Sequence, residues 1–395
     1  MEQDAMTDAD ARTTSPTPSR SLADKPKKLK FHTYPFWSPR FWHGMRLGDW
    51  WRLLCRNRFR MALLRIPMAV LVTMCAVLNT LLNWIERWRH GRRIEATEIT
   101  QPPVFIIGHW RSGTTYLHEL LVRDDRFAFP TTYECFASSH FLVSEWIVPK
   151  LIWFLLPSKR PMDNMAAGFD RPQEDEFALV TLGAPTPYLR MAFPNDPPPF
   201  MEFLDMQDAS PADVGRFRRD LREFVQRLTL LKEKRLILKS PPHTGRVALL
   251  ADLFPGAIFI HIVRDPYSIF ASTRRLWQSL DEVQGFQFPK HEHLDEYVFA
   301  AFERMYRGFE QQRSTLDPAR LYEIRYEDLV QDPLGQLETM YSKLHLGDFA
   351  AVRQNIAAYL SEQKDYQTNR HELEPDLKAD IRRRWASYFA RYGYE

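Results

Sequence analysis

Hydrophobic and polar residues follow an α/β pattern from Pro103 onward. Short apolar runs predict β-strands, and each is followed by a stretch whose apolar residues recur at helical spacing. Strands that alternate with helices are typical of a parallel sheet. We therefore predict an α/β fold over residues 101–395, a three-layer sandwich with a central parallel sheet. The predicted strands lie at 104–108, 235–240 and 257–264 and at the start of 321–329, and the predicted helices lie at 114–124 and 243–255, from 266 onward and at the end of 321–329.

The stretch 130–234 interrupts this pattern, because it is rich in proline and shows no regular period. We expect irregular insertions that bind the substrate there.

The chain before residue 100 reads differently. Residues 1–30 are rich in Asp, Thr, Ser, Pro and Lys, which predicts a disordered tail. Residues 31–100 are aromatic and basic, and we expect a helical, membrane-associated segment. Within it, Ile66 to Ile85 carries no charged residue, and a helix of that length can cross a bilayer. Basic residues flank it on both sides, which favours a helix lying in one face of the membrane. The alternative is a buried core helix or an oligomer interface, also for the second apolar stretch, 146–157.

Charge supports a membrane surface as partner, rather than nucleic acid. The net charge is only +3, but 14 Lys and Arg residues stand between Lys27 and Arg93 against Asp49 and Glu86. Tryptophan mixed with arginine in this block is typical of a membrane interface. The chain has three cysteines and no CxxC pair, which favours a reducing compartment. We expect the cytoplasmic face of a membrane, with a Golgi membrane and a luminal domain as the alternative.

The loop after the first predicted strand has the spacing of a phosphate-binding loop. Gly108 and Gly113 follow the Walker pattern GxxxxG, and a helix begins behind them. Such a loop favours bound phosphate through its backbone N–H groups. The Walker lysine is missing, and the cation stands inside the loop as Arg111. This argues for a phosphate-containing ligand other than ATP or GTP, with a P-loop kinase or NTPase as the alternative.

The loop "GHWRSGTT" resembles the 5′-phosphosulfate-binding loop of sulfotransferases that use 3′-phosphoadenosine 5′-phosphosulfate (PAPS). Its Arg-Ser-Gly-Thr-Thr form is similar to that of tyrosylprotein sulfotransferases and many bacterial homologues, whereas cytosolic sulfotransferases have lysine at this arginine. The resemblance implies a P-loop-like sandwich and PAPS as donor, without a metal. It assigns donor binding to Arg111, Ser112, Gly113, Thr114 and Thr115, with Arg111 also acting in catalysis.

Later segments resemble the same family in the same order, so that the resemblance covers Pro103 to about Arg370. "VRDPYSIFAS" is similar to the 3′-phosphate motif and assigns that phosphate to Arg264 and Ser272. "RYEDL" places Tyr326 near the nucleotide, and "DYQTNRHEL" places Arg370 over it.

The catalytic residues are less closely specified by the sequence. "LILKSPPH" resembles the segment that carries a catalytic lysine in tyrosylprotein sulfotransferases, which assigns to Lys239 the charge of the leaving phosphate. The general base is expected in "RPQEDEFAL", as Glu174 or Glu176, because packed like charges raise a carboxyl pKa. Glu134 and His140 are the reserve candidates.

These residues together predict transfer of a sulfuryl group from PAPS to an acceptor hydroxyl or amine. The basic, tryptophan-rich N-terminal segment favours an amphiphilic or lipid-like acceptor. A non-catalytic membrane adaptor that keeps the fold is the remaining alternative.

Overall fold

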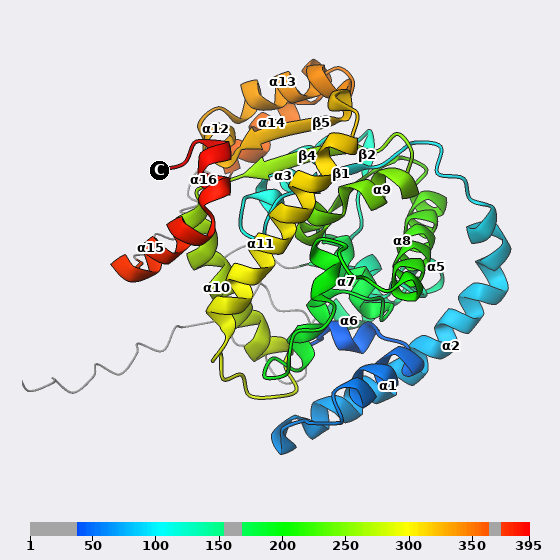
Figure 1. Ribbon diagram of the computed structural model, residues 1–395. Helices are drawn as coiled ribbons and strands as arrows, with labels where there is room; N and C mark the ends of the chain where they lie inside the picture. The colour runs from blue at the N-terminus through cyan, green and yellow to red at the C-terminus, as the bar shows by residue number, and fades with distance from the viewer. Residues whose placement is uncertain (1–37, 154–167, 363–372) are drawn as a thin grey trace, which may run out of the picture. The chain divides into compact units, whose positions relative to one another are not determined.

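Five parallel strands form the central sheet, in the order β2-β3-β1-β4-β5 (Figure 1). The computed structural model describes residues 38–153, 168–362 and 373–395. β1 lies in the middle, where Val104 pairs with Ile237 of β3 and with Ile258 of β4. The strands are β1 (Val104–Ile107), β2 (Phe127–Ala128), β3 (Arg235–Lys239), β4 (Ile258–Val263) and β5 (Leu321–Arg325).

Side chains of β1 alternate between two hydrophobic layers, as the period of a strand requires. Phe105 and Ile107 belong to one core cluster, and Val104 and Ile106 belong to the other. The first layer holds α9 (Val247–Leu253) and α11 (Leu294–Gln312). The second holds α3 (Thr114–Leu121), α12 (Tyr326–Gln331), α13 (Pro333–Leu344) and α14 (Ala350–Glu362). The predicted three-layer α/β sandwich with a parallel sheet is confirmed.

Three of the five strands were predicted within one residue of both observed ends, and a fourth begins at Leu321, as expected. The two-residue strand β2 was missed, because "FA" is too short to show any period. The helix expected from 266 extends as α10, Pro266–Gln284. Two further helices, α15 (Pro375–Arg384) and α16 (Ala386–Tyr392), follow α14 along the chain and complete the described C-terminal part.

The expectation of an irregular stretch over residues 130–234 is wrong. This part contains α4 (Thr132–Phe136), α5 (Phe141–Ser144), α6 (Val148–Ile152), α7 (Asp175–Thr181) and the 22-residue α8 (Pro211–Lys232). Ser210 is the N-cap that precedes helix α8, and its side chain accepts a hydrogen bond from the N–H of Asp213. Its buried face is Phe217, Leu221, Phe224, Val225 and Leu228, at helical spacing. Arginines between these positions made the helical spacing of the apolar residues difficult to recognise in the sequence.

The N-terminal segment shares the core of the larger domain. Helices α1 (Leu47–Arg56) and α2 (Ile66–Ala96) follow a short 3-10 helix, η1 (Phe41–Gly44). Trp42 and Trp50 are fully buried in the same cluster as Phe105. The boundary near residue 100 stays a prediction. The tail 1–30 and the end of the apolar stretch 146–157 lie outside the described residues.

Candidate functional site

The predicted site residues lie at one edge of the sheet. Lys239 ends β3, Arg264 follows β4, Tyr326 follows β5, and the glycine loop follows β1. Because all strands are parallel, their carboxyl ends share an edge, and ligands of open α/β sheets bind there where the strand order reverses.

The loop 108–113 has a backbone that requires its two glycines. Gly108 has φ 141°, and a Cβ on it would lie 2.4 Å from the carbonyl oxygen of Ile262. Gly113 has φ 106°, and its Cβ would meet the ring of Tyr326 at 2.3 Å. A side chain at either position would therefore push the loop away from β4 or α12. Gly113 is also the N-cap of α3, so the loop leads directly into a helix N-terminus.

The loop leaves a buried hydroxyl without a hydrogen-bond partner. Within the described part of the chain, Ser112 Oγ has no partner although the residue is fully buried. Thr114 is buried beside it and Thr115 is partly buried, both in the first turn of α3. Hydroxyls and free N–H groups at a helix start are suited to a phosphate group.

Two arginines far apart in sequence meet at this loop. Arg111 has φ 66°, unusual for a residue other than glycine, and its Nε donates to Ser272 Oγ at 2.8 Å. Arg264 Nη1 donates to the carbonyl oxygen of Arg111 at 3.0 Å, and its guanidinium lies 4.3 Å from the ring centre of Tyr326. The structure thus brings together Arg111, Arg264, Ser272 and Tyr326, as the sequence predicted.

Tyr388 fixes the backbone at Arg264. Its hydroxyl accepts from Arg264 N at 3.1 Å and donates to Arg264 O at 3.0 Å. This residue lies on α16, and nothing in its sequence context distinguishes it from the other tyrosines near the C-terminus. Sequence reasoning missed it.

Lys239 and Glu174 form a buried ion pair. Lys239 Nζ lies 2.7 Å from Glu174 Oε1 and 3.4 Å from Thr115 Oγ1, which joins β3 to the first turn of α3. The side chains of the pair are 3% and 11% exposed, so they are close to solvent only on the glutamate side. A carboxylate beside an ammonium group at the phosphate loop can accept a proton while the ammonium group stabilises negative charge.

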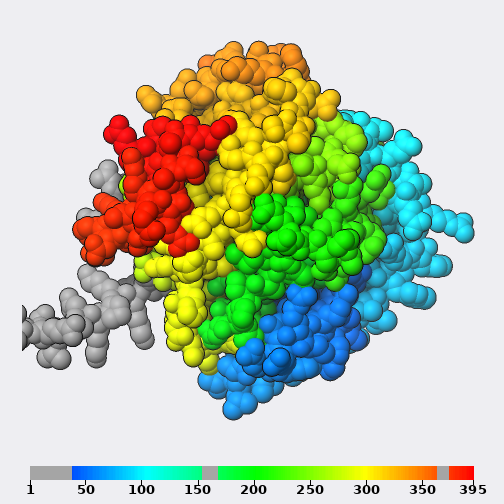
Figure 2. Space-filling view, viewed as in Figure 1, coloured from blue at the N-terminus to red at the C-terminus, as the bar shows by residue number. Residues whose placement is uncertain are grey.

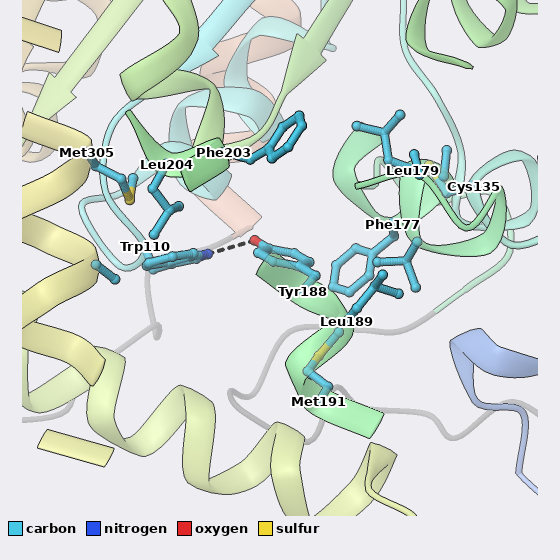
Figure 3. Close-up of a cluster of buried hydrophobic side chains, with 14 of the residues drawn as sticks. Trp110, Cys135, Phe177, Leu179, Tyr188, Leu189, Met191, Phe203, Leu204 and Met305 are labelled. Carbon is cyan, nitrogen blue, oxygen red and sulfur yellow. Dashed lines mark hydrogen bonds between the residues drawn. The ribbon is translucent and has the colours of Figure 1, made fainter. Parts of the chain in front are cut away.

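The second oxygen of Glu174 is held by residues that the sequence did not point to. Tyr188 donates its O–H to Glu174 Oε2 at 2.7 Å, and Trp110 Nε1 donates to the Tyr188 oxygen at 2.7 Å (Figure 3). Figure 3 shows the two rings among buried apolar side chains. Trp110 belongs to the glycine loop, so this chain connects the loop to the carboxylate. Its only sequence signal is the tryptophan inside "GHWRSGTT".

Glu176 has a different environment. Arg246 donates to both of its oxygens, at 2.9 and 3.0 Å, and Ser240 and Thr186 also donate to it. Burial raises the pKa of this carboxyl, but the charges of Arg246 and His243 and the hydrogen bonds from Arg246 and Thr186 together outweigh burial, and the net pKa lies below the usual value. We expected like charges to raise at least one carboxyl pKa in this acidic cluster, and at Glu176 the pKa is lowered instead. Its neighbour Asp175 pairs with His243 Nε2 at 2.6 Å, inside the core.

The two reserve candidates are bound into the framework. Glu134 closes a capping box with Thr131 at the start of α4 and pairs with Lys232 at 2.8 Å. His140 contacts Asn79 Oδ1 through Nε2 at 3.1 Å, beneath helix α2, and burial lowers its pKa to about 4. Arg370, the last predicted nucleotide contact, lies outside the described residues.

Comparison with known proteins agrees with this geometry. Residues 102–350 match the sulfotransferase family. The omega-hydroxy-beta-dihydromenaquinone-9 sulfotransferase Stf3 of Mycobacterium tuberculosis, and likewise that of Mycobacterium bovis, is 43% identical over 359 residues, 91% of this chain and 92% of that protein. Among solved structures, the fold is similar to sulfotransferase STF9 of Mycobacterium avium (TM-score 0.65, 17% identity, 80% of this chain and 82% of that one). It is also similar to STF1 of Mycobacterium tuberculosis (TM-score 0.59, 19% identity, 86% and 91%).

Proposed function

The chain belongs to the sulfotransferase family, and on that premise we propose that it transfers a sulfuryl group from PAPS to the hydroxyl of a lipid-like acceptor. The observation that carries the proposal is the Lys239–Glu174 ion pair beside the glycine loop, 2.7 Å between the charged atoms. It supplies a base and a cation at one place, the two groups that sulfuryl transfer requires.

The residues at the loop fit the donor. When bound, PAPS supplies an activated sulfuryl group on its 5′-phosphate. The buried, unpartnered Ser112 Oγ and the turn at Gly113 suit that phosphate, since a Cβ at Gly113 would fill the space against Tyr326. Arg264 and Ser272 hold the 3′-phosphate, and Tyr388 keeps the Arg264 backbone in place for it.

Glu174 acts as general base. Its carboxylate takes the proton of the acceptor hydroxyl while the acceptor oxygen bonds to sulfur and the bond from sulfur to the bridging oxygen breaks. Lys239 stabilises the charge that then develops on the leaving phosphate. Tyr188 orients the Glu174 carboxylate, because it donates to Oε2 while Lys239 contacts Oε1. Glu176 is a structural residue, because Arg246, Ser240 and Thr186 occupy its oxygens.

The acceptor is proposed from the relative. The Mycobacterium tuberculosis protein is named for a hydroxylated dihydromenaquinone, and the similarity extends over nine tenths of both chains. We therefore expect the hydroxyl of an isoprenoid quinone or a similar lipid alcohol. Such an acceptor resides in a membrane, and the free cysteines Cys55, Cys75 and Cys135 suit its cytoplasmic face.

Incubation with PAPS tests this proposal. Purified full-length protein is incubated with the donor and a lipid extract, and untargeted mass spectrometry should find lipids heavier by one SO₃ group. The E174Q variant is the control and should form none. Parallel calorimetry with 3′-phosphoadenosine 5′-phosphate (PAP) should show saturable binding to both proteins. Hydrolysis of Mg²⁺-ATP without binding of PAP would instead support a nucleoside triphosphatase and overturn the proposal.

A further inference from the structure

Helix α2 is apolar on two opposite sides, and only one of them is covered by other residues that the structure describes. The buried side includes Met68, Val72, Ala76 and Asn79. The other side carries large exposed side chains every three or four residues, which we call the apolar stripe: Val70, Met74, Leu78, Leu81, Trp84 and Trp88. A helix that is hydrophobic all round has an apolar neighbour on every side, which here means a second neighbour besides the protein.

The covered side fixes the helix to the domain along its length. Asn79 Nδ2 donates to the carbonyl oxygens of His43 and Met45, at 2.6 and 2.9 Å. Two turns further on, the buried Glu86 accepts from Arg227 Nε at 2.8 Å and from the Leu142 N–H at 2.9 Å. Separating the helix would leave these buried polar groups unpaired, so the apolar stripe cannot turn inward.

The apolar stripe has the composition of a membrane contact. Trp84 is 68% exposed and Trp88 is 80% exposed, and tryptophan concentrates at the boundary between headgroups and hydrocarbon. Exposed Trp146 and Leu151, beside and within α6, offer a further apolar contact. Arginines stand at both ends of the helix, which suits anionic headgroups: Arg58 and Arg60 before it, Arg89, Arg92 and Arg93 at its end. In Figure 2 the blue and cyan residues, which include α2, form one margin of the view.

We propose that α2 docks flat on a bilayer containing anionic lipid, with the apolar stripe in the interface and the helix axis in the membrane plane. The segment Leu63–Ala96 is long and apolar enough to cross a membrane. Crossing would require about 20 residues surrounded by lipid. The buried side of α2 instead extends from Met68 to Ile94, so a crossing helix would carry the attached domain, with its loop carbonyl groups, into the hydrocarbon.

This orientation also places few elements between the bilayer and the base, a point that rests on the proposed function. Helix α2 packs on η1, and η1 packs on α7, the helix that begins after Glu174. Phe41 of η1 stacks on Phe177 of α7, with 3.9 Å between ring centres. A single 3-10 helix thus separates the membrane-facing helix from the helix that follows the base, so the docked face of the domain lies on the side of α7.

Vesicle binding tests the docking surface. Full-length protein is sedimented with phosphatidylcholine vesicles with and without 30% phosphatidylglycerol. We expect binding to the anionic vesicles, and at least a tenfold lower partition coefficient for W84E/W88E. The control L231E places a glutamate on an exposed leucine of α8, outside the apolar stripe, and should bind like the wild type. PAP binding by each variant shows that it is folded, and it separates a failure of docking from a failure of the proposed function.

Two results would overturn the proposal. Protein that stays with the vesicles after alkaline carbonate extraction would indicate a helix that spans the bilayer. The second is wild-type protein that does not bind vesicles and sediments as a dimer, while W84E/W88E sediments as a monomer. That result would assign the apolar stripe to contact with a second copy of the chain.

Discussion

Lys239 and Glu174 neutralise each other at 2.7 Å, at the carboxyl end of a central strand where the buried ammonium group has Thr115 Oγ1 as a second contact. Removing one member would leave the charge of the other buried without its partner, so a change at either residue should affect both activity and stability.

Replacing Glu174 by Gln should lower kcat by about 100- to 10,000-fold, the usual contribution of a general base. PAP affinity should change little, because the proposed donor contacts lie on the glycine loop and at Arg264, which bonds to that loop. Steady-state kinetics and calorimetry measure the two effects. The control is E134Q, whose carboxylate caps α4 and pairs with Lys232, and which should lose stability but keep kcat. Equal loss of kcat in both variants would contradict our choice of base.

Tyr188→Phe removes the hydroxyl that connects Trp110 Nε1 to Glu174 Oε2. Two buried groups lose a partner, so the free energy of unfolding should fall by about 1–3 kcal/mol. Loss of orientation should lower kcat by about tenfold with KM for the donor nearly unchanged. Denaturant unfolding and initial rates measure both. If stability falls while kcat stays at the wild-type value, Tyr188 has only a structural role.

At Arg264, alanine and lysine should differ. R264A should weaken PAP binding by about 100-fold, and R264K by about tenfold, because lysine keeps the charge but not the planar fork. The fork is needed for both the Arg111 carbonyl contact and the stacking on Tyr326. Calorimetry measures the affinities. R274A, which removes an arginine paired with Asp295 on the surface, is the control, and a similar loss there would point to unspecific charge.

Stability should depend on pH through the histidines beneath α2. Burial lowers the pKa of His43 and of His140 to about 4 each. Between pH 6.5 and 4 these two histidines bind more protons in the unfolded chain than in the folded one. The free energy of unfolding therefore decreases as the pH is lowered, by up to about 3 kcal/mol per histidine.

Asp281 has the opposite effect on the pH dependence of stability, because burial raises its pKa to about 6 although the charge of Arg190 lowers it. The contribution of a histidine is therefore measured by comparing the wild type with a variant of that single residue. Urea unfolding of wild type and H140Q at pH 7, 6 and 5 measures the effect. The variant should lose less stability on acidification. Parallel curves for the two proteins would show that His140 does not titrate in this range.

Much of the fold could be predicted from the sequence, and so could the grouping of Arg111, Arg264 and Ser272, because both depend on local patterns. Short apolar runs that alternate with helical segments predict the strands. Because parallel strands end at the same edge of the sheet, the residues that end them, such as Lys239, can be assigned to one site. What could not be predicted depends on tertiary contact. Glu174 and Glu176 stand two residues apart with similar neighbours in sequence, and only the fold gives one to Lys239 and the other to Arg246. Tyr388 reaches Arg264 from 124 residues away, with no motif of its own.

The all-parallel sheet has a consequence for how the site comes into being. Each parallel neighbour is reached by a long crossover, and the donor-site hydrogen bonds join residues 161 and 153 positions apart. No fragment holds Arg111, Arg264 and Ser272 together until β4 has joined β1 and α10 has formed, and long-range pairing of this kind is slow. On the proposed function, the nucleotide should therefore bind only the folded chain, and the cellular supply of donor should stabilise newly made protein by mass action.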